Sequence, residues 1–340
     1  MKVISVVNQK GGCGKTITAV NLAAALSKMN QKVLLIDLDP QAHATFALKK
    51  ESDFTITDIL EKTTQNQQIH QKDIYREVSP SLYFIGSSIG LASLEHTLST
   101  RNDKIDVLKK FLDKAGNNFD YAVLDCPPNL GLLTLNALAA STYALIPINT
   151  CYFSLRGTAI LKDILGMLKE HKQTAPGAFY LLSQVDLRSS FSRIFVDKIK
   201  DELGNLLLNT IIRTNTQLRE AASGGQHIFD YKSDSRGACD FMSLAEEVNS
   251  LSSETNWTPL FLRKNGLSEV YVVGDFTDWK KNEEFKLKKI GDDLWNINLQ
   301  LNKGQYRYKF LTGQDWIIDP YNKKTEDDPF GGKNSVLIVK

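Results

Sequence analysis

One stretch near the N-terminus decides the fold of this chain: Gln9-Lys10-Gly11-Gly12-Cys13-Gly14-Lys15-Thr16. It follows the apolar run Val3–Val7 and precedes a helical stripe of apolar residues that begins at Ala19. A glycine-rich turn between a strand and a helix lets backbone N–H groups converge on phosphate oxygens, and the helix N-terminus adds its dipole. The stretch therefore predicts a phosphate-binding loop, although Gln9 stands where the common pattern has glycine.

The apolar runs in the first 250 residues predict an α/β fold. They are rich in Val, Ile and Leu without polar alternation, which is typical of strands buried on both faces. Amphipathic helical stretches separate them, so we expect a doubly wound, mostly parallel sheet over residues 1–250. The runs are Val3–Val7, Val33–Ile36, Leu82–Ile85, Tyr121–Leu124, Ala144–Ile148 and Ala178–Leu182.

The pattern changes near residue 250. Residues 251–258 are mostly polar and are predicted as a linker. Beyond them apolar residues alternate with period two, from Trp295 to Leu301 and from Tyr306 to Phe310, and residues 302–305 between them favour a hairpin turn. Residues 259–340 therefore predict a small all-β, immunoglobulin-like sandwich with Trp295 in its core.

Composition places the chain among globular proteins. Its 340 residues are enough for two domains, and 42% hydrophobic with 24% charged residues is an ordinary balance. The sequence contains no apolar run of membrane-spanning length and no signal peptide pattern. The four cysteines are too widely spaced for a metal site, so we expect reduced thiols in a cytoplasmic protein. The net charge is +2, so nucleic-acid binding would need a local basic patch.

Carboxylates at two strand ends complete the predicted nucleotide site. Asp39 closes the segment Asp37-Leu38-Asp39 after the second strand, and Asp125 ends the run that starts at Tyr121. Carboxyl ends of parallel strands line the ligand crevice of a doubly wound sheet. We expect Lys15 to bind phosphate, the Thr16 hydroxyl to bind Mg²⁺, and these carboxylates to orient water or hold Mg²⁺ through water.

These segments together resemble the ParA/MinD, Soj-like, deviant P-loop ATPases. The likeness covers about residues 1–250 and rests on KGGxGKT at Lys10–Thr16, DxDPQ at Asp37–Gln41 and DxPP at Asp125–Pro128. It implies hydrolysis of ATP with Mg²⁺, slow unless a protein partner stimulates it. It also implies a homodimer that closes on ATP, in which Lys10 reaches the partner's phosphates and Asp39 positions the attacking water.

The resemblance carries a set of expected site residues. The catalytic ones are Lys10, Lys15 and Asp39, and the magnesium-binding ones are Thr16, Asp39 and Asp125. The expected nucleotide-contacting residues are Lys10, Gly11, Gly12, Cys13, Gly14, Lys15, Thr16, Ile17, Asp39 and Asp125.

Two later segments match that family less well. Cys151 and Arg156 replace two glutamates of its segment after the strand at Ala144–Ile148, so no contacts are carried over from there. Ser183–Asp186 occupies the stretch that often touches adenine, and an ordinary strand end remains the alternative.

Relatives of the ParA type bind DNA non-specifically as ATP dimers, whereas MinD relatives bind membrane through a C-terminal amphipathic helix. This chain ends in a predicted β segment, which argues against membrane binding. DNA binding would place the protein at the nucleoid, and the alternative for scattered cations is solvated surface. The candidate DNA-binding residues are Arg188, Arg193, Arg213, Arg219, Lys232 and Arg236.

The segment 259–340 resembles the glycogen-binding module of AMP-activated kinase beta subunits and the N-terminal modules of branching and debranching enzymes. The likeness rests on GDFTDW from Gly274, YRYKF from Tyr306 and WIIDP from Trp316. Indoles stack on the apolar faces of sugar rings, and amide or ammonium groups bind the hydroxyls. The matching glucan-binding positions are Trp279, Lys309, Trp316, Phe330 and Asn334.

The sequence therefore predicts an ATP-driven switch that positions a cargo, with a C-terminal module that binds an α-glucan. The alternative is a MinD-like or scaffold ATPase whose β module recruits a protein partner, with neither DNA nor carbohydrate bound.

Overall fold

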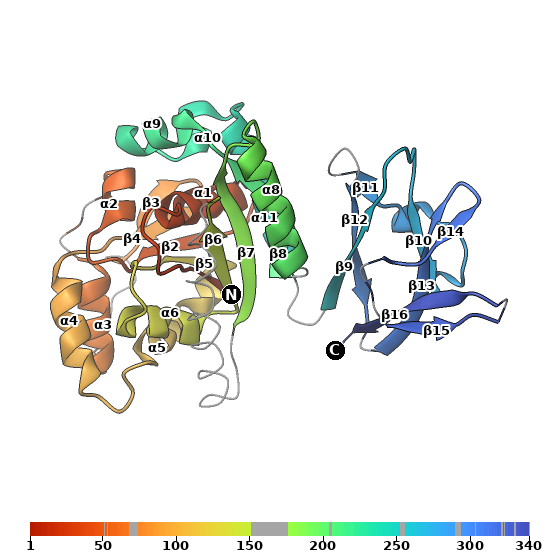
Figure 1. Ribbon diagram of the computed structural model, residues 1–340. Helices are drawn as coiled ribbons and strands as arrows, with labels where there is room; N and C mark the ends of the chain where they lie inside the picture. The colour runs from red at the N-terminus through yellow and green to blue at the C-terminus, as the bar shows by residue number, and fades with distance from the viewer. Residues whose placement is uncertain are drawn as a thin grey trace. The chain divides into compact units, whose positions relative to one another are not determined.

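The computed structural model describes residues 1–340 except 51, 53, 68–73, 151–175, 204–205, 252–255, 290–293, 303, 321, 323, 330 and 340. The chain divides into two compact units, Met1–Ser250 and Leu251–Lys340 (Figure 1). Each unit has its own hydrophobic core.

The first unit is built on a sheet whose strand order is β3-β4-β2-β5-β1-β6-β7-β8. All neighbours in it are parallel except β3 and β4, which are antiparallel. The predicted doubly wound, mostly parallel sheet is thus confirmed. Its strands are β1 (Lys2–Val6), β2 (Val33–Asp37), β3 (Arg76–Ser79), β4 (Leu82–Ile85), β5 (Tyr121–Asp125), β6 (Tyr143–Ile148), β7 (Gly177–Val185) and β8 (Leu207–Arg213).

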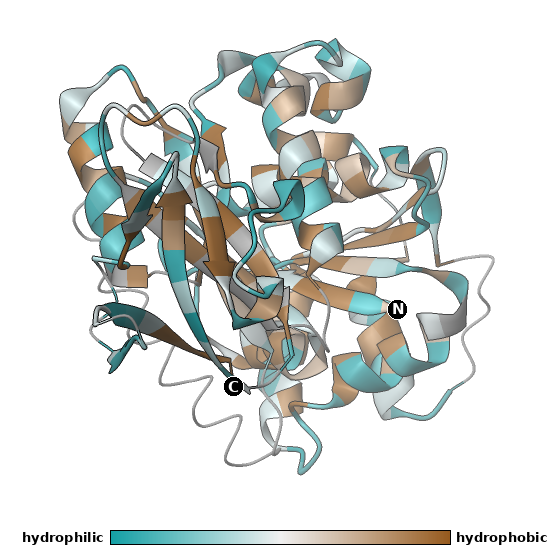
Figure 2. Ribbon diagram, turned by 90° about the vertical axis from the view of Figure 1, so that its right-hand side faces the viewer, coloured by the Kyte–Doolittle hydropathy of each residue, from teal (hydrophilic) through white to brown (hydrophobic). Residues whose placement is uncertain are grey.

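Helices cover the sheet because its central strands are apolar on both faces. Strands β2, β5 and β6 are buried along their whole length, and Figure 2 shows hydrophobic residues, in brown, along the strand that begins beside the N-terminus. Helix α1 packs against α11 and β5, whereas apolar residues of α3, α4, α5 and α6 join one cluster with the strands. The helices are α1 (Lys15–Lys28), α2 (His43–Leu48), α3 (Ile56–Thr64), α4 (Gly90–Ser99), α5 (Val107–Ala115), α6 (Leu132–Ala140), α8 (Ser190–Leu203), α9 (Thr216–Gly224), α10 (Ile228–Lys232) and α11 (Arg236–Ser250).

The strand order places the nucleotide motifs at one edge of this sheet. Strand β5 lies between β1 and β2, and Asp37 is paired in register with Asp125. The glycine-rich loop leaves β1 at the same end, because Val6 is paired in register with Asp125. Three segments far apart in the sequence therefore meet at the carboxyl ends of adjacent parallel strands.

The second unit is an all-β sandwich of two antiparallel sheets. One sheet has the order β10-β13-β16-β15 with β14 added beside β13, and the other has the order β11-β12-β9. Apolar residues of both sheets form one core, which includes Trp295, Tyr308 and Phe310. The strands are β9 (Asn256–Arg263), β10 (Tyr271–Gly274), β11 (Lys288–Lys289), β12 (Leu294–Leu301), β13 (Gly304–Thr312), β14 (Asp315–Ile317), β15 (Thr325–Asp327) and β16 (Lys333–Val339).

Two local expectations differ from the structure. The predicted hairpin between β12 and β13 is wrong, because the two strands belong to different sheets: β12 pairs with β9 and β11, whereas β13 pairs with β10, β14 and β16. Strand β9 begins at Asn256, inside the range 251–258 predicted as a linker, because Asn256 pairs with Leu301 at the far end of β12. Among the described residues, none of the helices has the length and apolar character needed to cross a membrane.

Candidate functional site

The loop between β1 and α1 has the backbone shape of an anion cradle. Gly12 and Gly14 have φ angles of 71° and 89°, in the region that disfavours other residues. A Cβ atom on Gly14 would also lie 2.8 Å from the Ser183 hydroxyl oxygen. Gly14 caps α1 without any side-chain hydrogen bond, so the first N–H groups of the helix remain open to an anion.

The two lysines of the loop take different positions. Lys15 is buried, at 8% exposure, and its Nζ donates to the backbone oxygen of Lys10 at 3.2 Å. The Nζ of Lys10 instead donates to Asn149 Oδ1 at 2.9 Å, just after β6. The Lys10 amide donates to Asn8 Oδ1, and Asn8 Nδ2 donates to Pro147 O at 2.7 Å. Lys10 is therefore held by residues of its own chain.

The other residues of the predicted loop lie between β1 and the first turn of α1, as expected from the sequence. Gly11 and Gly12 are exposed, and Thr16 and Ile17 form the first turn of α1 and are half-buried. Cys13 is buried, and its thiol donates to the Lys10 backbone oxygen at 3.2 Å. Burial raises the pKa of this thiol, although the nearby Lys15 ammonium opposes the change.

Three carboxylates meet at the ends of β2 and β5. Asp37 accepts hydrogen bonds from the Thr45 amide and hydroxyl at 2.9 and 2.8 Å, and from the Asp39 amide. Asp39 is 4% exposed; it accepts from the Gln41 amide at 2.9 Å, and its other oxygen is 3.7 Å from His43 Nδ1. Asp37 therefore fixes the loop that presents Asp39.

Asp125 is the least satisfied of these carboxylates. Both of its oxygens are fully buried, and neither accepts a geometrically sound hydrogen bond from the described residues. Burial raises its pKa well above the ordinary range, and the Asp37 carboxylate beside it adds to this; Thr16 and Lys15 act in the opposite direction. A buried carboxylate in this state favours the arrival of a cation or of donors.

The residues at this edge fit a magnesium nucleotide. Mg²⁺ is commonly held by one or two protein oxygens, water and the phosphates themselves. Among the described residues, no cluster of three or more His, Cys, Asp and Glu side chains forms a metal cage. The Thr16 hydroxyl and the unsatisfied Asp125 can supply the protein oxygens for Mg²⁺, and the open N–H groups of α1 can bind the phosphates.

Several residues that the sequence motifs do not include also shape the site. Asn8 and Asn149 hold Lys10, and Thr45 holds Asp37. Ser183 and Gln184, which belong to the stretch singled out in the sequence for adenine contact, lie against Gly14, and Gln184 has a positive φ of 56°. The available signal was a polar residue at the end of a buried apolar run, Asn8 after Val3–Val7 and Asn149 after Ala144–Ile148.

The predicted DNA-binding cations fall into two groups. Arg188 is ion-paired with Asp186 at 2.9 Å, and Arg213 is ion-paired with Asp240. Arg193, Arg219, Lys232 and Arg236 are exposed. The structure brings three of these cations together, since a hollow of about 270 Å³ at the ends of β7 and β8 is lined by Arg188, Arg213 and Arg236, with Val185, Asp186, Leu187 and Thr214.

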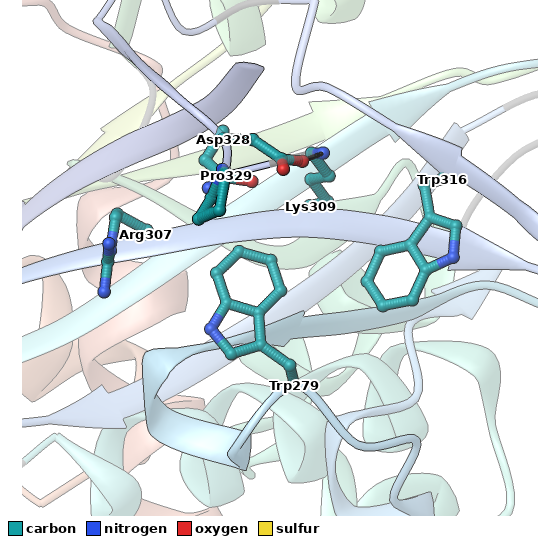
Figure 3. Close-up of a pocket in the computed structure, with 7 residues that line it drawn as sticks. Trp279, Arg307, Lys309, Trp316, Asp328 and Pro329 are labelled. Atoms are coloured by element: carbon teal, nitrogen blue, oxygen red, sulfur yellow. Dashed lines mark hydrogen bonds and ion pairs between the residues drawn. The ribbon is translucent and has the colours of Figure 1, made fainter. Parts of the chain in front are cut away.

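The second unit contains a larger pocket, which we call the indole pocket (Figure 3). Its volume is about 490 Å³. The indoles of Trp279 and Trp316 stand 6.3 Å apart between ring centroids and are inclined by 36°. Lys309 alternates with the core residues Tyr308 and Phe310, so it leaves β13 on the face opposite the core. The lining is Trp279, Arg307, Lys309, Trp316, Asp328, Pro329 and Asn334.

Trp279 is held in a strained conformation at this pocket. Asp278 and Trp279 have φ angles of 50° and 58°, which is uncommon for residues other than glycine. The Trp279 amide donates to Gly274 O at 3.0 Å, and its indole N–H donates to Asp275 Oδ1 at 3.2 Å. Arg307 in turn holds Asp275 through its Nε and Nη2 atoms, both at 3.1 Å. The position of this indole is thus fixed by several contacts.

Four of the five predicted glucan-binding residues line this pocket, namely Trp279, Lys309, Trp316 and Asn334. Asn334 is 4% exposed, and its Oδ1 accepts no hydrogen bond among the described residues. Phe330, the fifth residue, lies outside the described residues, as do Cys151 and Arg156. Trp295 is 4% exposed, which confirms it as a core residue.

Comparison with known families matches a different family model to each of the two units. A family model described as an AAA domain matches residues 1–175, and one described as the glycogen recognition site of AMP-activated protein kinase matches residues 259–340.

Similar proteins are found for the first unit. The chain is 36% identical over 253 residues to the sporulation initiation inhibitor protein Soj of Bacillus subtilis, covering 73% of this chain and 98% of that protein. It is 34% identical to the chromosome-partitioning ATPase Soj of Treponema pallidum, covering 73% and 96%. Cobyrinic acid a,c-diamide synthase from Mycobacterium smegmatis, solved with a bound ATP analogue and magnesium, is 26% identical, with a TM-score of 0.59 over 72% of this chain and 93% of that chain.

Proposed function

The chain belongs to the Soj/ParA family of P-loop ATPases, which use Mg-ATP, and from this premise we propose that ATP closes it into a homodimer that binds DNA while its β module holds an α-glucan. The observation that carries the proposal is that one chain holds both a complete phosphate loop and the indole pocket. The first supplies a nucleotide-dependent switch, and the second supplies a place for a neutral polysaccharide cargo.

The residues of the first site have distinct tasks in this proposal. The loop amides and Lys15 bind the phosphates, and Thr16 and Asp125 hold magnesium, which neutralises phosphate charge when it is bound. Asp39 orients the attacking water and accepts its proton. Lys10 leaves Asn149 and reaches the phosphates held by the partner protomer, so the dimer is closed only while the terminal phosphate is present.

DNA binding is supported by exposed positive side chains and by similarity to a partitioning ATPase. One relative of this chain is named a chromosome-partitioning ATPase. This chain itself exposes Arg219, Lys232 and Arg236 on α9, α10 and α11. Phosphate contacts need only cations on one surface. Arg188 and Arg213 already have carboxylate partners, so we assign the larger share of binding to the exposed cations Arg193, Arg219, Lys232 and Arg236. A protein partner that stimulates hydrolysis and a location at the nucleoid belong to the same proposal.

Glucan binding is supported by the construction of the indole pocket. Two inclined indoles present flat apolar faces to pyranose rings, and Lys309 and Asn334 offer donors and acceptors for hydroxyls. The strained Trp279 is held in place before any ligand arrives, which reduces the ordering cost of binding. The other possibility is a protein partner of the β module in a MinD-like or scaffold ATPase.

Calorimetric titration of the full chain with maltoheptaose tests the glucan assignment. We expect millimolar or tighter binding that is lost in the Trp279→Ala/Trp316→Ala double variant. Tyr231→Ala, which removes an aromatic side chain that is 43% exposed on the ATPase unit, should bind as the unchanged chain does. Absence of binding at millimolar maltoheptaose would reject the glucan and favour the protein partner.

A further inference from the structure

We propose that Asp328, paired with Lys309, determines which glycans the indole pocket binds. The pair makes the pocket bind neutral, unphosphorylated α-glucan more tightly than phosphorylated or carboxylated sugars. The inference rests on the proposed glucan binding and adds a specificity-determining residue to it. None of the glucan-binding positions expected from the sequence includes this carboxylate.

The Lys309–Asp328 pair is built into the pocket. Lys309 Nζ lies 2.6 Å from Asp328 Oδ2, and both side chains are 12% exposed. The Asp328 amide donates to Gly332 O at 2.9 Å, and the Asp328 carbonyl accepts from the Gly331 amide at 3.0 Å. The carboxylate is therefore carried by a hydrogen-bonded turn between β15 and β16, and Figure 3 shows it beside the Lys309 ammonium.

The second cation of the pocket is compensated in the same way. Arg307 donates to Asp275 from both Nε and Nη2, and its backbone amide donates to Asp275 Oδ2 at 2.7 Å. Each positive side chain in the lining thus has a carboxylate within hydrogen-bond distance. The pocket presents polar groups without a net positive field for an anion.

Such a pair suits a hydroxyl group better than it suits a phosphate. A sugar hydroxyl donates one hydrogen bond and accepts others, so one hydroxyl can bind the ammonium and the carboxylate together. A phosphate accepts only, and it would meet the Asp328 carboxylate at close range in a partly desolvated site. Removing one partner of a desolvated pair leaves the other charge uncompensated, so loss of Asp328 would turn Lys309 into an anion-binding group.

A purely structural role for the pair predicts a different result. If the pair only ties the β15–β16 turn to β13, its loss lowers stability and weakens all ligands together. A purely structural role would leave the ratio of the affinities for neutral and charged ligands unchanged.

The test compares maltoheptaose with maltoheptaose 6-phosphate on the full chain, by titration calorimetry. We expect the unchanged chain to prefer the neutral sugar at least about tenfold. Asp328→Asn keeps the shape and removes the charge, so it should shift the ratio of the two affinities toward the phosphorylated sugar by at least about tenfold. Asp328→Glu restores the charge and should return the preference toward the original.

Glu269→Gln is the matched control, since it removes a carboxylate that pairs with Lys281 at 2.7 Å outside the pocket lining. It should leave the ratio unchanged. An unchanged chain that binds the phosphorylated sugar as tightly as the neutral one overturns the inference, whether or not the variants fold, and so does Asp328→Asn with an unaltered ratio; in both cases glucan binding itself stands. If the unchanged chain binds neither sugar, the proposed function fails first.

Discussion

Lys10 carries the switch in this account, and its position in the single protomer has a consequence. Its ammonium donates to Asn149 at 2.9 Å, so closing the dimer must break or exchange that hydrogen bond. A hydrogen bond to a charged group contributes about 1.5–3 kcal/mol when it is well shielded, and less where the lysine is only half-buried. If the proposed dimer forms, Asn149 therefore favours the single chain over the dimer.

Two variants should move dimerisation in opposite directions. Lys10→Ala removes the cation that bridges the protomers, so we expect monomers at saturating Mg-ATP. Asn149→Ala releases that cation, so we expect the dimer at an ATP concentration a fewfold lower. Analytical ultracentrifugation in an Asp39→Ala background, where hydrolysis is slowed, measures both.

A Lys10→Ala protein that dimerises normally with Mg-ATP would contradict the role of this lysine. A matched control is Lys2→Ala, which removes a lysine from β1, outside the loop. It should leave dimerisation unchanged.

Single residues also show how far the sequence could reach. Lys15, Thr16 and Asp39 follow from spacing alone, because strand ends and the glycine loop fix their places. The structural role of Asp37 could not be predicted, because its hydrogen bonds to Thr45 depend on the position of α2 in the folded chain. Asp328 is one turn residue among several acidic ones, and only the tertiary pairing with Lys309 distinguishes it.

Helix α1 depends on the backbone shape of Gly14. An alanine there would adopt an unfavourable positive φ and would bring its Cβ within 2.8 Å of the Ser183 hydroxyl. We expect Gly14→Ala to lower the free energy of unfolding by about 1–2 kcal/mol in the absence of nucleotide. The matched control is Gly11→Ala, because a Cβ atom on Gly11 would meet nothing within 4 Å.

Urea unfolding followed at the α-helical circular dichroism band measures this difference. That band reports the ATPase unit, since the described part of the β module contains no α-helix. Equal destabilisation by the two substitutions would show that the loop tolerates an alanine at Gly14 and that its backbone shape is not required.

Whether a strand could be predicted from the sequence depends on whether it forms a continuous apolar run. Buried parallel strands such as β2 and β5 are continuous apolar runs, so the sequence predicts them well. Strand β3 (Arg76–Ser79) is half-exposed at the sheet edge and has no such run. The hairpin predicted between β12 and β13 is wrong because local alternation does not show whether the next strand joins the same sheet or the opposite one.

The molecule combines two units with separate cores, so we expect each proposed function to be removable without loss of the other. Changes at Trp279 and Trp316 should spare nucleotide and DNA binding, and changes at Lys10 should spare glucan binding. The sequence predicts both units because each carries its own short motifs, but it leaves open what links their activities.

A bridging assay tests the central claim most directly. Beads coated with duplex DNA are mixed with the full chain and fluorescent glycogen, in Mg-ATP or in Mg-ADP. We predict that glycogen is captured in Mg-ATP and not in Mg-ADP, and that the Trp279→Ala/Trp316→Ala variant still binds the DNA but captures no glycogen. Unchanged chain that coats the DNA in Mg-ATP and captures no glycogen would contradict the account.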